Sequence, residues 1–230
     1  MTSAIEAVVF DVDGTLYDQS RLRRAMLLKL IRAYALRPLR SRQVARVIRA
    51  YRHAQEELRE STIDDPARQQ ASVAARRTGM PTADVERITG RWLEREPLRV
   101  LARYRRAGLV ETLAALRSDG VLLGIVSDYP ADDKLTALGV RHFFDVVVSA
   151  QDPDVGAFKP NPRGLQVCLA RLGVRAENAL YVGDRPEIDA AAAQSSGMSC
   201  VIIGSRPRTV APDHVAITAF AQLLTECARS

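Results

Sequence analysis

Residues 7–15, AVVFDVDGT, lie near the start of this 230-residue chain and decide the fold. Four apolar residues in succession, Ala7 to Phe10, predict a short strand that is buried on both faces, as in a parallel sheet. Two aspartates and a glycine follow at once, which predicts a tight polar loop where the strand ends. Because open α/β sheets bind ligands at the carboxyl ends of their strands, this loop is the first candidate site.

The rest of the chain divides into a helical part and an alternating part. Helical periodicity with little β-branched sequence predicts helices at 20–36, 41–60, 66–79 and 82–95. Further strands are expected at 121–126, 144–149, 179–182 and 200–203. Further helices are expected at 109–118, 131–138, 162–172, 187–195 and 217–228. The alternation predicts an α/β fold, a doubly wound, Rossmann-like parallel sheet with helices on both faces. We assign residues 1–16 and 107–230 to this core and residues 17–106 to an inserted all-helical cap.

Composition bounds the choice of partners. Apolar residues make up 47% of the chain, which is enough for a sizeable core, and the net charge is +6. Residues 16–106 hold 22 basic and 10 acidic residues, so the positive charge is concentrated in the predicted cap. Only three of the 33 basic residues in the chain are lysines. A chain-wide arginine bias is typical of nucleotide composition, which we favour over nucleic-acid binding.

Cysteine usage and the N-terminus indicate a cytoplasmic protein. The three cysteines are odd in number and form no CxxC pair, which favours reduced thiols over disulfides or a zinc site. The N-terminus lacks the pattern of a signal peptide. No apolar run approaches the ~20 residues of a membrane helix, so no membrane partner is expected. The sequence carries no signal for the oligomeric state.

The first polar loop and a later one both supply carboxylates. Asp11 and Asp13 lie two residues apart at a strand end, so their side chains are expected on the same side. Two such carboxylates can divide labour between a nucleophile or metal ligand and a general acid and base. Magnesium prefers oxygen ligands, and Asp11, Asp184 and one backbone carbonyl would suit it, with Asp189 behind them. The alternative is an ordinary acidic turn.

Two further polar residues follow predicted strands. Lys159 lies between Phe158 and Pro160, in a position where its ammonium would offset charge on a phosphoryl group or a carboxylate. Ser127 ends a predicted strand, and its hydroxyl would bind phosphate oxygens together with nearby backbone N–H groups. A helix cap or turn is the alternative for Ser127. No GxSxG sequence surrounds it, which disfavours a serine-hydrolase nucleophile.

Together these loops resemble the motifs of the haloacid dehalogenase-like (HAD) hydrolase superfamily, in its phosphatase branch with an α-helical cap between the first two motifs. The matching stretches are DVDGT at 11–15, VSD at 126–128, FKP at 158–160 and GDRPEID at 183–189. Their order and spacing match over nearly the whole chain. The second acid of the last motif stands five residues after Asp184, a longer spacing than the commonest one, which weakens only the role given to Asp189.

The resemblance implies a mechanism through an aspartyl-phosphate. Asp11 would attack phosphorus, and Asp13 would protonate the leaving oxygen and then activate water. Lys159 would balance the charge on Asp11 and on the phosphoryl group. Mg²⁺ would be held by Asp11, the Asp13 carbonyl and Asp184, with Asp189 in support. The groups implied to bind the phosphoryl group are Gly14, Ser127, Asp128 and Lys159.

The expected function is therefore a Mg²⁺-dependent phosphatase that hydrolyses a small phosphorylated metabolite. Asp13 favours phosphate esters, because carbon–halogen and carbon–phosphorus hydrolases of this type lack an aspartate there. Two alternatives stay open, a phosphomutase of the same fold and a nucleic-acid-binding module that uses the arginine-rich cap. The identity of the substrate, and the cap residues that select it, have no signal in the sequence.

Overall fold

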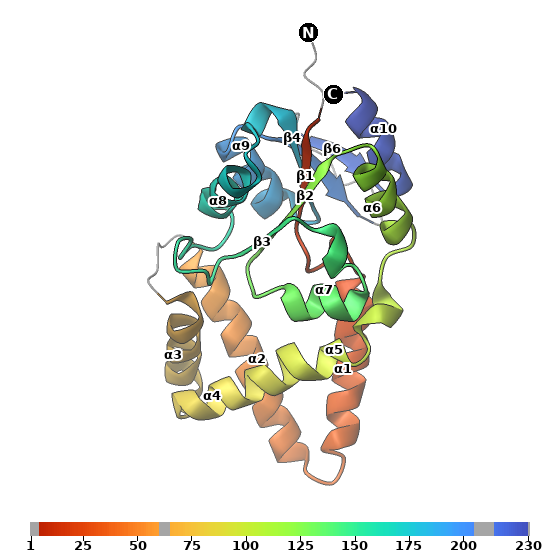
Figure 1. Ribbon diagram of the computed structural model, residues 1–230. Coiled ribbons are helices and arrows are strands. Elements are labelled where there is room, and N and C mark those ends of the chain that lie inside the picture. Colours follow the sequence, from red (N-terminus) through yellow and green to blue (C-terminus); the bar gives the residue numbers. More distant parts are fainter. Residues whose placement is uncertain (1–4, 60–64, 205–213, 230) are drawn as a thin grey trace.

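The computed structural model describes residues 5–59, 65–204 and 214–229. A six-stranded parallel sheet with helices on both faces forms one end of the molecule, and a group of helices forms the other (Figure 1). In chain order the strands are β1 (Ala7–Phe10), β2 (Leu122–Ser127), β3 (Val146–Ser149), β4 (Ala179–Gly183), β5 (Ser199–Ile203) and β6 (His214–Ile217). Their spatial order is β3-β2-β1-β4-β5-β6, which confirms the predicted doubly wound fold.

The apolar run of β1 is explained by what covers the sheet. Val8 and Phe10 point to one face, and Ala7 and Val9 to the other, because side chains alternate along a strand. The helices that cover the first face are α6 (Leu109–Ser118), α7 (Asp132–Leu138) and α10 (Ala221–Arg229). The helices that cover the second face are α8 (Arg163–Leu172) and α9 (Ala191–Ser195). All four β1 residues are fully buried, so neither face accepts a polar residue.

Strand β1 is the point at which the winding of the sheet reverses. It pairs with β2 on one side and with β4 on the other, and Phe10 lies opposite both Ile125 and Val182. The residues that follow β1, β2 and β4 therefore meet at one edge of the sheet, where ligands bind in folds of this kind.

Residues 17–106 form a segment that we call the helical insert (Figure 1). Its helices are α1 (Gln19–Ala33), α2 (Pro38–Leu58), α3 (Pro66–Thr78), α4 (Thr82–Thr89) and α5 (Glu96–Leu98). Helices α1 to α4 share an apolar cluster that includes Val47, Val85 and Trp92. The chain enters and leaves the insert side by side, since the Asp18 N–H donates to the Tyr104 carbonyl over 2.8 Å.

Several element boundaries differ from those predicted. The helix expected at 82–95 is broken, because α4 ends at Thr89 and a π-helical turn follows at Gly90–Arg95. The helix expected from residue 41 begins at Pro38, since proline suits the first turn of a helix, and its expected last residue, 60, lies outside the described residues. A second π-helical turn, Pro186–Ala190, precedes α9. Short 3₁₀ turns lie at Leu101–Tyr104, Arg141–Phe143 and Ala176–Asn178.

The end of the described chain departs most from expectation. A single helix was predicted at 217–228, whereas the structure has the edge strand β6 followed by α10. Ile217 is buried and pairs with Ile203 of β5, so its apolar side chain serves the sheet and not the helix. Among the described residues, no helix combines the length and apolar character that crossing a membrane requires.

Candidate active site

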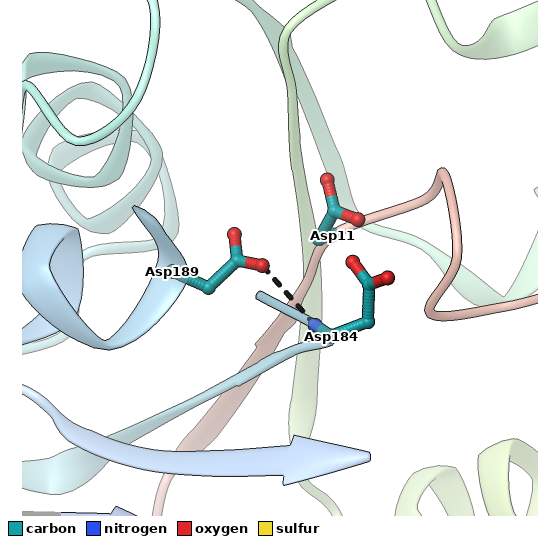
Figure 2. A group of neighbouring side chains, drawn as sticks. All are labelled: Asp11, Asp184 and Asp189. Atoms are coloured by element: carbon teal, nitrogen blue, oxygen red, sulfur yellow. Dashed lines mark hydrogen bonds between the residues drawn. The ribbon is translucent and has the colours of Figure 1, made fainter. Parts of the chain in front are cut away.

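The polar residues singled out in the sequence converge at one edge of the sheet. Asp11 follows β1, Ser127 ends β2 and Asp184 follows β4, while Lys159 lies in the loop between β3 and α8. Figure 2 shows the carboxylates of Asp11, Asp184 and Asp189 turned toward one another. One oxygen from each lies within 4.8 Å of the others. The sheet topology thus gathers carboxylates that are distant in the sequence.

Lys159 is the cation at the centre of this group, and only 4% of it is exposed. Its Nζ donates to Asp11 Oδ1 at 2.6 Å, to Asp189 Oδ1 at 2.7 Å and to the Tyr181 hydroxyl at 2.9 Å. Burial alone lowers the pKa of this lysine, but the charges of Asp11 and Asp189 outweigh it and hold the pKa well above its usual value. Lys159 therefore stays charged and its position is fixed by three partners.

Asp11 is almost fully buried, and its charge is only partly compensated. Lys159 binds one carboxylate oxygen, and the Thr15 hydroxyl donates to the other at 3.1 Å. Burial raises the pKa of Asp11, Lys159 lowers it, and the charges of Asp189, Asp184 and Asp13 raise it again. The net shift is upward, so an additional cation beside Asp11 would be favourable.

Asp184 stands beside Asp11 and accepts no hydrogen bond on its carboxylate from the residues that the structure describes. Burial and the charge of Asp189 raise its pKa. The carboxylate rests against Gly14, where a Cβ would overlap it and where φ is +100°. Glycine is required at that position for both reasons. The Gly14 carbonyl accepts from the Arg106 guanidinium at 2.7 Å, a contact that sequence reasoning missed.

Asp189 is saturated by donors from the protein. Its Oδ1 receives Lys159 and Tyr181, and its Oδ2 receives the backbone N–H groups of Asp184 at 3.1 Å and Arg185 at 2.9 Å. Burial raises the pKa of Asp189, but Lys159 and these donors outweigh it and lower the pKa. Its geometry suits a residue that orients Lys159 and the loop at Asp184.

Asp13 has an environment opposite to that of Asp11. Both carboxylate oxygens receive Lys134 Nζ at 2.7 Å, and the Tyr17 hydroxyl donates to Oδ1. Burial raises the pKa of Asp13, but Lys134 and Tyr17 outweigh it and lower the pKa. Asp13 is therefore ionised, and its carboxylate lies outside the three-carboxylate group. Sequence reasoning missed both partners, although Lys134 is one of only three lysines.

Ser127 and Asp128 lie at the end of β2, and both side chains form hydrogen bonds with other residues of the chain. The Ser127 hydroxyl is buried and accepts the Tyr129 N–H at 3.3 Å. The Asp128 carboxylate accepts the Lys159 N–H at 3.1 Å, Gln55 Nε2 at 2.9 Å and Arg59 Nη1 at 2.8 Å. The Asp128 carboxylate thus connects the loop between β3 and α8, which carries Lys159, to the helical insert.

Arg59 is the main polar contact between the helical insert and the sheet edge, and sequence reasoning missed it. It is 8% exposed and also donates to the Lys159 carbonyl at 2.5 Å. Tyr129 adds a second connection, since its hydroxyl donates to Gln55 Oε1 at 2.9 Å and accepts from Gln70 Nε2 at 2.8 Å. The C-terminal end of α2 therefore lies directly against the candidate site.

Comparison with known proteins gives a consistent match. The sequence profile of a family described as haloacid dehalogenase-like hydrolase matches residues 5–197. A glyceraldehyde 3-phosphate phosphatase of Methanopyrus kandleri is 33% identical over 204 residues, 86% of this chain and 84% of that protein. A phosphoglycolate phosphatase of Salmonella paratyphi A is 30% identical over 202 residues, 82% of this chain and 78% of that protein.

Solved structures agree on the fold. The HAD phosphatase from Thermococcus onnurineus superposes with a TM-score of 0.65 at 25% identity, over 96% of this chain and 97% of that one. A 2-haloacid dehalogenase from Pseudomonas syringae reaches a TM-score of 0.68 at 23% identity, over 98% and 99% of the two chains. Because a dehalogenase and a phosphatase share this architecture, the site residues must decide the chemistry.

Proposed function

This chain belongs to the haloacid dehalogenase-like hydrolases, and we propose that it is a phosphatase that cleaves a small phosphorylated metabolite through an aspartyl-phosphate on Asp11. Two phosphatases of small phosphorylated metabolites are its relatives over most of the chain. The observation that carries the proposal is the buried pair of Asp11 and Lys159 beside Asp184, at the edge where the sheet reverses. This arrangement supports a carboxylate nucleophile with a fixed cation at its side.

The chain's own residues would perform two displacements. Asp11 attacks phosphorus, the bond to the leaving oxygen breaks, and Asp13 gives that oxygen its proton. Water then attacks the same phosphorus, Asp13 takes the water's proton, and the bond between Asp11 and phosphorus breaks to release phosphate. Lys134 and Tyr17 favour the ionised form that Asp13 has between the two displacements, in which it accepts the water's proton. Asp13 then gives that proton to the leaving oxygen of the next substrate. Phosphoryl transfer needs mainly such positioning and neutralisation of charge.

Gly14, Ser127 and Asp128 are proposed to hold the phosphoryl oxygens, with Lys159 opposite. The Ser127 hydroxyl and the backbone N–H groups of Gly14 and Asp128 are the donors in this proposal. The Asp128 carboxylate is engaged by Arg59 and Gln55, which supports a role for its backbone and not its side chain. Charge-assisted hydrogen bonds of this kind are the strong ones in phosphate binding.

The carboxylates also fit a divalent cation. Asp11 and Asp184 have raised pKa values and face each other, and carboxylate oxygens are the ligands that Mg²⁺ prefers. We propose that they hold Mg²⁺ together with the Asp13 carbonyl, while Asp189 orients the surrounding loop. When bound, the ion neutralises charge on the phosphoryl oxygens and on the nucleophile.

Residues 17–106 are proposed to act as a cap over the core formed by residues 1–16 and 107–230. The adjacent entry and exit of the helical insert, and the position of α2 against the site, support this division. A cap that closes over the substrate excludes water from the first displacement.

Cys168, Cys200 and Cys227 are free thiols, which supports a reducing, cytoplasmic location.

Phosphate release from p-nitrophenyl phosphate and a panel of metabolite phosphates tests the proposal. We expect turnover that requires Mg²⁺, stops in EDTA, and is lost in Asp11→Asn. Asp119→Asn is the matched control, because Asp119 is an exposed aspartate at the end of α6. Transfer of phosphate to a second hydroxyl without release of inorganic phosphate would instead indicate a mutase.

A further inference from the structure

We propose that Arg23 and Arg52 of the helical insert bind a second anionic group of the substrate, separate from the phosphate that is cleaved. The preferred substrate is then a phosphorylated acid or a bisphosphate, and not an ester with a neutral far end. This inference rests on the proposed phosphatase function, because it assigns the part of the substrate that the sheet edge does not hold.

Arg52 lies on the face of α2 that is turned toward the site. Gln55, Glu56 and Arg59 are three, four and seven residues further along, which places all four on one side of the helix. Gln55 and Arg59 bond to Asp128, and Glu56 accepts from Arg185 Nη1 at 3.2 Å. Arg52 therefore lies one turn before Gln55 and Glu56 in the helix, on the side of α2 that faces the sheet edge.

Arg23 faces the same space from α1. Met26 and Leu30, three and seven residues later, pack in the apolar cluster shared with α2, so the face of α1 that carries Arg23 is turned toward α2. Tyr17, just before α1, is bonded to Asp13. We infer that the two arginines lie near each other in the corner between α1 and α2, on the side where Asp13 stands, because Arg23 and Asp13 both influence Arg52 electrostatically.

The charges around Arg52 agree with this placement. Burial lowers the pKa of Arg52, and the positive charge of Arg23 lowers it further. The negative charge of Asp13 acts in the opposite direction. Asp13 is the group that faces the leaving oxygen in the proposed mechanism, so a cation near Asp13 is near the leaving group and not near the transferred phosphoryl group.

These two arginines differ from the other cations at the site. Arg59 binds Asp128, Lys134 binds Asp13 and Lys159 binds Asp11. Neither Arg23 nor Arg52 has an ion pair or a side-chain hydrogen bond within the described ranges 5–59, 65–204 and 214–229. Two neighbouring like charges repel, and an anion between them relieves the repulsion. Paired guanidinium groups also match the geometry of carboxylates and phosphates.

The inference separates the substrates named for the two relatives. Phosphoglycolate carries a carboxylate opposite its phosphate, whereas glyceraldehyde 3-phosphate ends in a neutral aldehyde. Two arginines that have no bonded partner in the described part of the chain favour the first kind of molecule. The chemistry that the arginines recognise is the second negative group, whether it is a carboxylate or a phosphate.

Two matched pairs of phosphates test the inference. The first pair is 2-phosphoglycolate and 2-hydroxyethyl phosphate, and the second is fructose 1,6-bisphosphate and fructose 6-phosphate. We expect wild-type kcat/KM to favour the doubly anionic member of at least one pair. Arg52→Gln and Arg23→Gln should each lower kcat/KM for that member by about 10- to 100-fold, the size expected for a lost charge-assisted hydrogen bond. They should leave the singly anionic member nearly unchanged.

Arg24→Gln is the matched control for charge. Arg24 is exposed and adjoins Arg23, but it shares the face of α1 that carries Leu28, which is 56% exposed. We expect this variant to behave as wild type with both members of each pair. Equal losses on both members in Arg52→Gln, or a wild-type preference for the neutral ends, would overturn the inference.

A binding measurement tests the role of the arginines independently of the proposed phosphatase activity. Asp11→Asn protein in Mg²⁺ is titrated calorimetrically with the four phosphates, and the Arg52→Gln change is then added. If wild type releases phosphate neither from these four compounds nor from p-nitrophenyl phosphate and the metabolite panel, the phosphatase proposal fails. The titration still decides the role of the arginines in that case. Tighter binding of a doubly anionic member that depends on Arg52 supports the inference, and binding without that preference contradicts it.

Discussion

The sheet edge and the surface of the helical insert that faces it differ in how far their charged side chains are paired. At the sheet edge, Lys159 joins two carboxylates and Asp189 has donors on both oxygens, so the charges are held in fixed positions by one another. On the insert, Arg59 is engaged with Asp128, whereas Arg23 and Arg52 have no bonded partner among the described residues. A site whose charged groups fix one another in position is suited to a reaction step that is the same for many substrates. A surface with uncompensated charge is suited to selecting among them.

The largest expected effect comes from removing the cation at the sheet edge. Lys159→Met leaves the buried carboxylates of Asp11 and Asp189 without their shared partner. Breaking a buried pair in this way costs about 3–5 kcal/mol of stability. Urea unfolding of the metal-free protein measures the loss, and kcat/KM should fall by about 10²-fold or more.

Lys29→Met supplies the contrast from the insert. Lys29 pairs with Glu96 at 2.6 Å, but its side chain is 39% exposed. Exposed ion pairs contribute about 0–1 kcal/mol, so this variant should be nearly as stable as wild type. A loss for Lys29→Met that equals the loss for Lys159→Met would show that the two regions do not differ as described.

Asp184→Asn should stabilise the metal-free protein while it abolishes binding of Mg²⁺. Burial, together with the charge of Asp189, raises the pKa of Asp184 from 3.8 to about 7. A raised carboxyl pKa means that stability is fully present below pH 3.8 and is lost as the pH rises through about 7. Asparagine cannot ionise, so near pH 8 the variant should be more stable by on the order of 1–3 kcal/mol.

Thermal unfolding in EDTA and in Mg²⁺, at pH values on both sides of neutrality, checks this prediction. The advantage of the variant should shrink in acid, and Mg²⁺ should stabilise wild type but not the variant, because a ligand stabilises only the state that binds it. A wild-type protein that is more stable than Asp184→Asn in EDTA near pH 8 would contradict the prediction.

The sequence was enough to predict a site residue where the position of the backbone alone brings that residue to the site. Asp11, Ser127 and Asp184 each follow or end a short apolar strand, and parallel strands present their carboxyl ends at one edge. Lys159 was found by its rarity in a chain that otherwise uses arginine. The strand β6 was missed because its four residues, His214–Ile217, adjoin a helical pattern and include two exposed positions, Val215 and Ala216.

Partners that depend on side-chain packing had no such signal. Lys134 reaches Asp13 only because α7 packs beside the first loop, and no spacing rule links the two residues. Arg59 contacts Asp128 across 69 residues, in a segment where arginines occur on every face of the helices. The sequence therefore predicted the carboxylates that meet at the sheet edge, but not the cations at the end of α2 and in α7 that bind two of them.

Lys134→Met tests one of the partners that the sequence did not predict. Lys134 lowers the pKa of Asp13, so its removal should raise that pKa. In the proposed mechanism Asp13 must be ionised to take the proton of the attacking water. The decay of the phosphoenzyme should then fail at a higher pH than in wild type. Single-turnover decay across a pH series measures the shift, with Lys29→Met as the lysine control. If the decay rate falls at the same acidic pH in the variant and in wild type, Lys134 does not set the ionisation of Asp13.

The smallest effect is expected at the rim between the two regions. Arg185 of the sheet edge and Glu56 of the insert form an ion pair at 3.2 Å, but their side chains are 40% and 49% exposed. Arg185→Gln should therefore change the free energy of unfolding by less than about 0.5 kcal/mol, and salt should reduce the difference further. Arg59→Gln, which removes the buried partner of Asp128, should cost more, and urea unfolding of both variants compares them directly. If the two substitutions cost the same, the contact between insert and core is spread along its rim. If Arg59→Gln costs more, the contact is concentrated at the end of α2, beside the loop that carries Lys159.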